Sequence, residues 1–109
     1  MHELGITRNI VGIVSEQAGD AKVVRVLLEI GQLSMVVPDA IRFCFDIVSK
    51  HTVLEGAELQ IREIPGRARC NACAHEFAID QPFGRCRCGS TSICCIAGEE
   101  LTVKEMEIV

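Results

Sequence analysis

Four cysteines arranged in two closely spaced pairs are the residues of this chain best suited to chemistry. The first pair is Cys70 and Cys73, and the second pair is Cys86 and Cys88. Each pair can present two sulfurs from one turn, and Zn²⁺ takes four such ligands tetrahedrally. The stretch between the pairs has too few large apolar residues to hold a fold by packing alone. We therefore expect zinc to hold this segment together, and we expect disorder without it.

The second pair leaves the ligand set open, because only Arg87 separates Cys86 from Cys88. Zinc ribbons more often have two residues between the cysteines. Glycines flank the pair and permit sharp turns, so these two cysteines remain the first choice. Cys94 is the reserve ligand, and His75 is the most credible histidine alternative.

Disulfides are the other common use of paired cysteines, but they need an oxidising compartment. The N-terminus lacks the basic and apolar segments of an export signal. No run of residues is long and apolar enough to span a bilayer. We therefore expect a cytoplasmic protein without a membrane partner, in which paired cysteines favour metal.

The opening residues Met1, His2 and Glu3 offer nitrogens to a second metal. These nitrogens are the free amine of Met1, the amide and imidazole of His2, and the amide of Glu3. Square-planar coordination by nitrogen points to Ni²⁺ or Cu²⁺ and away from Zn²⁺. Glu3 or Asp39 could add an oxygen ligand or a supporting hydrogen bond. A histidine at position 2 is more often a frayed terminal residue, so these residues alone indicate the site only weakly.

Two helices and three strands are expected around the cysteines. Apolar residues recur at helical spacing over 4–18, and again after Pro38, which suits a first helical position. Alternating residues predict strands at 23–30 and 57–64, and the tail 101–109 is strand-like in composition. In the first strand the side chains expected on one face are Val24, Val26, Leu28 and Ile30.

These elements predict an α+β fold, with two helices on one face of a small three-stranded sheet and an inserted zinc-ribbon-like module. The expected division is a nickel-binding α/β domain of residues 1–66 plus 98–109, and a zinc-binding module of residues 67–97. The module lies between the second and third strands in the sequence. Pairing of the third strand and zinc binding are therefore expected to be linked.

Several short motifs occur together over the whole length of the chain. They are Met-His-Glu at the start of a helix, Ile-Gly-Gln at the end of a strand, Phe-Cys-Phe-Asp in the second helix, and Cys-x-x-Cys followed by a second cysteine pair and Gly-Ser. In this combination the chain resembles the HypA/HybF family of hydrogenase maturation factors. The resemblance covers essentially all 109 residues. One departure is the second pair, which is normally Cys-x-x-Cys in that family.

The resemblance implies a nickel metallochaperone for nickel-iron hydrogenase maturation, and not an enzyme. It implies that His2 binds Ni(II) together with main-chain nitrogens of Met1 and Glu3. It also implies a structural Zn(II), and partners that are a HypB-type GTPase and the hydrogenase large subunit precursor. A monomer or weak homodimer is expected. The implied zinc ligands are Cys70, Cys73, Cys86 and Cys88.

The alternative function is a zinc ribbon that binds nucleic acid or another protein and transfers no nickel. Four arginines between residues 67 and 87 favour contacts with phosphate. The formal net charge of −4 and the absence of Trp and Tyr oppose such contacts, so no nucleic-acid partner is expected. Four thiolates also leave zinc no open coordination position, which argues against a zinc enzyme.

Overall fold

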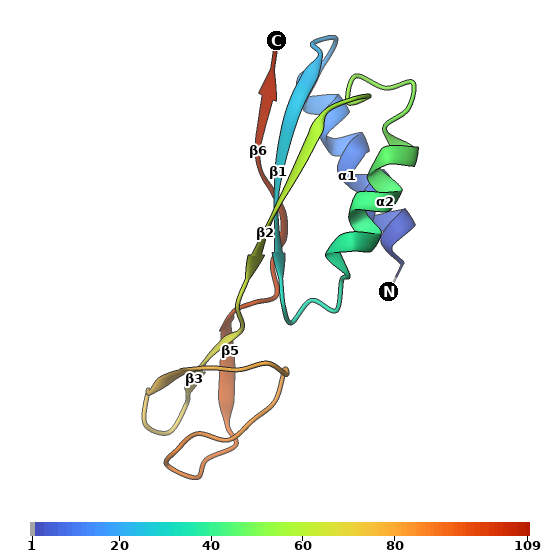
Figure 1. Ribbon diagram of the computed structural model, residues 1–109. Coiled ribbons are helices and arrows are strands. Elements are labelled where there is room, and N and C mark those ends of the chain that lie inside the picture. Colours follow the sequence, from blue (N-terminus) through green and yellow to red (C-terminus); the bar gives the residue numbers. More distant parts are fainter. Residues whose placement is uncertain (1) are drawn as a thin grey trace.

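The computed structural model describes residues 2–109, and Met1 lies outside the described residues. Two separate three-stranded sheets lie at opposite ends of a molecule 53 Å long (Figure 1). The first sheet has the order β2-β1-β6, and the second has the order β4-β3-β5. The elements are α1 (Glu3–Ala18), β1 (Val23–Gly31), α2 (Pro38–Val48), β2 (Glu58–Ile64), β3 (Arg67–Cys70), β4 (Glu76–Ala78), β5 (Ile93–Ala97) and β6 (Leu101–Ile108).

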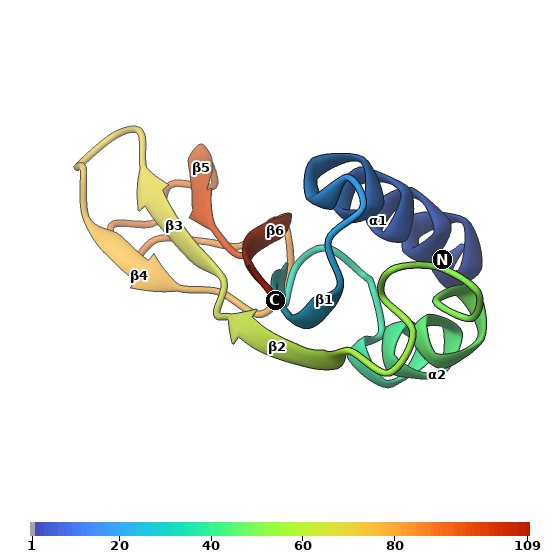
Figure 2. The same ribbon diagram turned by 90° about the horizontal axis from the view of Figure 1, so that it is seen from above.

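Both helices cover the same face of the first sheet (Figures 1 and 2). Their buried residues recur every three or four positions, which places them on one side of each helix. The predicted α+β arrangement of two helices on a small sheet is confirmed. The buried side chains that form this core include Ile10, Val11 and Val14 of α1, Ile41 and Phe45 of α2, and Val26, Leu28 and Ile30 of β1.

The strand order of the first sheet follows from how the chain connects its strands. β1 and β2 are parallel, because α2 carries the chain back between them. β6 pairs antiparallel with the other side of β1, with Leu27 opposite Glu105. This last strand reaches the sheet only after the chain has passed through the second sheet.

One face assignment in β1 is wrong. Val24 is exposed, whereas its neighbour Val23 is fully buried. The pairing of β1 with β6 shifts register between Val23 and Arg25, which moves the side-chain alternation by one residue. Sequence alternation alone also missed the short strands of the second sheet.

The two sheets meet at a neck formed by Gly31, Gly66 and Gly98. A Cβ atom on Gly31 would overlap the backbone of Gly98, and one on Gly98 would lie 2.6 Å from the Cα of Gly66. Gly98 also has φ of +107°, which favours glycine. The buried residue Leu33 packs against this junction, and its amide donates to the Gly98 carbonyl at 2.7 Å. Only glycines allow the chain segments to approach this closely.

Candidate metal centres

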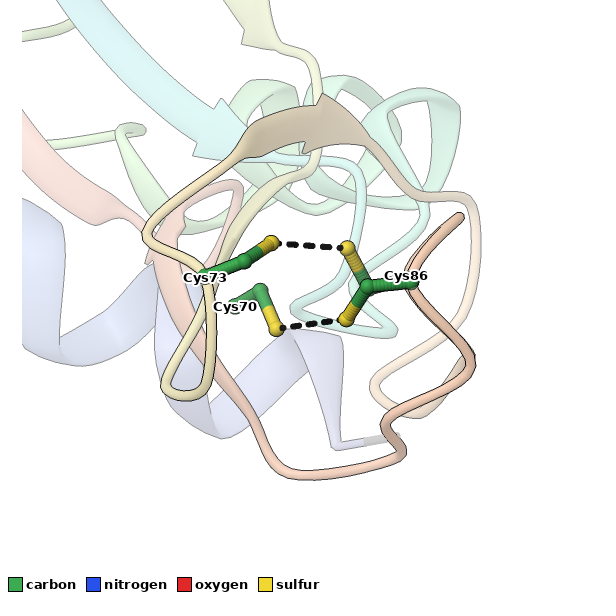
Figure 3. Close-up of side chains that lie close together, drawn as sticks. Cys70, Cys73 and Cys86 are labelled. Carbon is green, nitrogen blue, oxygen red and sulfur yellow. Dashed lines mark hydrogen bonds between the residues drawn. The ribbon is translucent and has the colours of Figure 1, made fainter.

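The sulfur atoms of Cys70, Cys73, Cys86 and Cys88 all lie within 4.8 Å of one another. The closest contacts join the two pairs, with Cys70 to Cys88 at 3.6 Å and Cys73 to Cys86 at 3.5 Å. Figure 3 shows Cys70 and Cys73 on one loop, facing Cys86 on another loop. Tetrahedral zinc with Zn–S bonds of about 2.3 Å places its sulfurs about 3.8 Å apart. The group therefore fits one Zn²⁺ ion.

The first cysteine pair is positioned by the tight turn between β3 and β4. Cys70 ends β3, and its carbonyl accepts a hydrogen bond from the amide of Ala74 at 2.9 Å. Ala74 has φ of +62°, which reverses the chain directly after Cys73. The amide of Ala72 donates to the Cys70 sulfur at 3.4 Å. This turn holds both sulfurs on the same side of the loop.

A second tight turn explains how one intervening residue is enough for the other pair. The amide of Gly89 donates to the Cys86 carbonyl at 2.8 Å, and the amide of Cys86 donates to the Ser90 carbonyl at 2.9 Å. Gly89 has φ of +95°, so the flanking glycine adopts the left-handed conformation that a sharp turn needs. Cys88 lies inside this turn and faces Cys70.

The two cysteine loops are joined to each other by hydrogen bonds. The amide of Asn71 donates to the Ser92 carbonyl at 2.9 Å, and its side-chain amide donates to the Ser92 hydroxyl at 3.1 Å. Neither residue was singled out from the sequence, because nothing in the spacing indicates that these positions are adjacent. These bonds hold the turn after Cys70 next to the segment that follows the second cysteine pair.

Cys94 and His75 lie outside the four-sulfur group within residues 2–109. Cys94 is exposed on β5, where it pairs with Arg69 of β3. The ring of His75 stacks on Phe77 with centroids 5.9 Å apart. The four sulfurs therefore converge without help from the reserve cysteine or the histidine.

Hydrogen-bond donors around Cys70 favour its charged form. The amide of Cys73, together with that of Ala72, lowers the pKa of the Cys70 thiol from 9.0 to about 6, against the opposing effect of burial. Cys70 is thus a thiolate at neutral pH, which is the form that binds zinc.

Zinc should be retained at neutral pH and released only in acid, below the Cys70 pKa of about 6, because bound zinc competes with protons for the sulfur. Because the folded pKa of Cys70 lies below the unfolded one, its contribution to stability is complete above pH 9, decreases toward pH 6 and is lost below that value. A chromophoric zinc chelator present during a slow acid titration measures the release. Release already at about pH 8 would contradict the lowered pKa.

His2 is the N-cap residue of α1, in the helical layer that covers the first sheet, and is exposed (Figure 1). Its carbonyl accepts the first helical hydrogen bond, from the amide of Ile6 at 3.1 Å. The amides of the first helical residues have no acceptor within the helix, which leaves those of His2 and Glu3 available to a metal. The structure does not place the amine of Met1, which lies outside the described residues.

The carboxylate of Glu3 joins the starts of the two helices. It accepts a hydrogen bond from the amide of Val37 at 3.2 Å, directly before α2, and this bond lowers the pKa of Glu3. The Thr7 hydroxyl donates to the Glu3 carbonyl at 2.7 Å. Asp39 lies exposed in the first turn of α2. The contact between Glu3 and Val37 was not predicted from the sequence, because it joins residues 34 positions apart.

Residues 1–108 match the family model described as Hydrogenase/urease nickel incorporation, metallochaperone, hypA. The chain belongs to the HypA family. It is therefore a maturation factor of a metallochaperone family and not an enzyme. No helix within residues 2–109 has the length and apolar character needed to cross a membrane.

Relatives of similar length support this membership. The hydrogenase maturation factor HypA of Nostoc sp. is 62% identical over 108 residues, which cover 99% of this chain and 96% of that protein. The factor of the same name from Geobacter metallireducens is 48% identical over 109 residues, which cover 99% of this chain and 99% of that protein. The solution structure of the Ni metallochaperone HypA from Helicobacter pylori has a TM-score of 0.73 at 24% identity, covering 100% of this chain and 98% of that one. That structural likeness supports the HypA fold.

Proposed function

We propose that this HypA-family protein binds Ni(II) through His2 and main-chain nitrogens of Met1 and Glu3, and delivers it to a nickel-iron hydrogenase. The observation that supports this most directly is the position of His2. It is exposed at the first turn of α1, beside amides that the helix leaves without acceptors. An exposed terminal site permits ligands to be exchanged one at a time, so the cargo can be passed on.

The conformation of His2 bears on how nickel would enter. Two adjacent amide nitrogens can chelate one ion only when they lie on the same side of the Cα–C bond between them. In this structure ψ of His2 is 69°, so the amide nitrogens of His2 and Glu3 are rotated apart. Binding would require rotation about the Cα–C bond of His2, the N-cap residue. The bond from Val37 to the Glu3 carboxylate can persist during that rotation.

The zinc centre has a different role in this proposal. Cys70, Cys73, Cys86 and Cys88 would hold Zn(II) permanently and leave no coordination position open for a reactant. The ion would stabilise the second sheet as a scaffold. The proposed nickel-binding domain consists of residues 1–66 plus 98–109, and the proposed zinc-binding module of residues 67–97. The boundaries between them lie at Gly66 and Gly98, two of the neck glycines.

The partners that this function requires are a HypB-type GTPase and the hydrogenase large subunit precursor. The relatives are named hydrogenase maturation factors, which supports a role within that machinery. These partners and a cytoplasmic location belong to the proposal.

Nickel titration of zinc-loaded, tag-free protein tests the function. Substitution of His2→Ala should abolish the absorption of planar Ni²⁺, because it removes the imidazole ligand. Extension of the N-terminus by one residue should do the same, because it displaces the free amine. His51→Ala provides the control, because His51 is also exposed but lies beyond α2. Unchanged nickel binding by the His2 variant would refute the proposal.

A further inference from the structure

A cavity of about 580 Å³ lies where the second sheet meets the neck. Phe77 and Ile79 line it from β4 and the residue after it, Phe83 and Arg85 line it from the segment before the second cysteine pair, and Gln32 lines it from the neck. Its volume is within the range of sites that bind ligands or short peptide segments, roughly 300–1,000 Å³. Apolar walls with a few polar groups are typical of such sites.

Phe83 is the exposed aromatic residue of this cavity, with 69% of its surface accessible. Phe77 is half-buried beside it. A large ring exposed at a concave surface has apolar area that a partner can cover favourably. Aromatic residues in this position are frequent anchors of protein interfaces.

Arg85 supplies a charge that the protein does not neutralise by pairing. No carboxylate within residues 2–109 forms an ion pair with it, whereas Arg69 on the same module pairs with Glu76 at 3.0 Å. Asp80 is the one acidic residue among those that line the cavity. A partner with a single carboxylate suits Arg85, and a run of acidic residues would be repelled by Asp80 and by zinc-bound thiolates.

Strand β4 adds to the same cavity backbone groups that pair with no other strand of residues 2–109. It is the edge strand of its sheet, and Phe77 pairs with Ala68 of β3. The amide of Ile79 donates to the Gly66 carbonyl, so the alternate residues 77 and 79 direct their backbone groups toward β3. The amide and carbonyl of Ala78 therefore point away from β3, and Ala78 also lines the cavity. An edge of this kind can accept a further extended segment.

We propose that this cavity binds an extended segment of a partner protein that carries an aromatic or large apolar side chain close to one carboxylate. The backbone of the segment pairs with Ala78. Its apolar side chain packs against Phe77 and Phe83, and its carboxylate accepts hydrogen bonds from Arg85. A segment bound there spans the module and the neck, and it leaves the starts of α1 and α2 free. This site is separate from the proposed nickel site.

Selection of random short peptides displayed on phage tests this, with the full-length, zinc-loaded protein as target. Enriched peptides should share an aromatic or large apolar residue near one acidic residue. Fluorescein-labelled copies should bind about tenfold more weakly to the variants Phe83→Ser and Arg85→Glu, since both remove an anchor. Replacement of the acidic residue of the peptide by lysine should weaken binding to wild type similarly. Zinc content, measured for each variant, verifies that the module is intact.

The chain provides matched controls. Phe43 has the same 69% exposure as Phe83 but lies on α2, and Arg8 is exposed on α1. The variants Phe43→Ser and Arg8→Glu should bind the selected peptides as wild type does. Peptides without a common aromatic and acidic pattern would overturn the proposal. Binding that is unchanged in Phe83→Ser and Arg85→Glu, or that is weakened equally in Phe43→Ser, would overturn it as well.

Discussion

Replacement of Cys86 by serine should remove zinc from the protein and unfold residues 67–97. Cys86 is buried, and its sulfur lies 3.5 Å from that of Cys73, so no solvent ligand can take its place without opening the loop. Structural zinc contributes about 10–16 kcal/mol of apparent binding free energy in small modules, which exceeds any packing energy available there. Zinc per chain, measured by atomic emission, and amide hydrogen exchange across the module report the two effects.

Cys94→Ser is the matched control for this substitution. It removes a thiol from the same module, but Cys94 is exposed on β5 and lies outside the four-sulfur group. This variant should retain one zinc ion and wild-type hydrogen exchange. If Cys94→Ser lost zinc while Cys86→Ser kept it, the ligand assignment would have to change to Cys94.

Alanine at position 31 should destabilise the protein by about 1–3 kcal/mol, the typical cost of forcing an extra group into packed surroundings. The added Cβ would overlap the backbone carbonyl of Gly98. That backbone cannot retreat easily, because the Gly98 carbonyl accepts a bond from Leu33 and the Glu100 carbonyl accepts one from Gly31, both at 2.7 Å. Urea unfolding of the zinc-loaded protein measures the loss as a lower transition midpoint.

Gly12→Ala separates this steric effect from the general effect of replacing glycine. Gly12 lies within α1, and an added Cβ would meet no atom within 4 Å. Alanine should therefore raise stability by about 1 kcal/mol through its higher helix propensity. Equal destabilisation by the two substitutions would show that the close approach at the neck has no special cost.

Local pattern was sufficient to predict the helices and the first sheet. Residues such as Ile41 and Phe45 recur at helical spacing, and burial of one side of each helix requires that pattern. Local pattern could not predict that Val24 is exposed, because the register shift in β1 depends on how β6 pairs with β1. The strands β3, β4 and β5 are too short for alternation to be recognised.

The sequence by itself determined that this chain carries two paired-cysteine turns and an N-terminal histidine, and residue types with short spacings are sufficient for that conclusion. It also determined membership of the HypA family. Only the tertiary structure decided that Cys70 faces Cys88, that Glu3 bonds to Val37, and that glycines join the two sheets. Those contacts join residues far apart in the chain, so their geometry depends on how the separate elements pack.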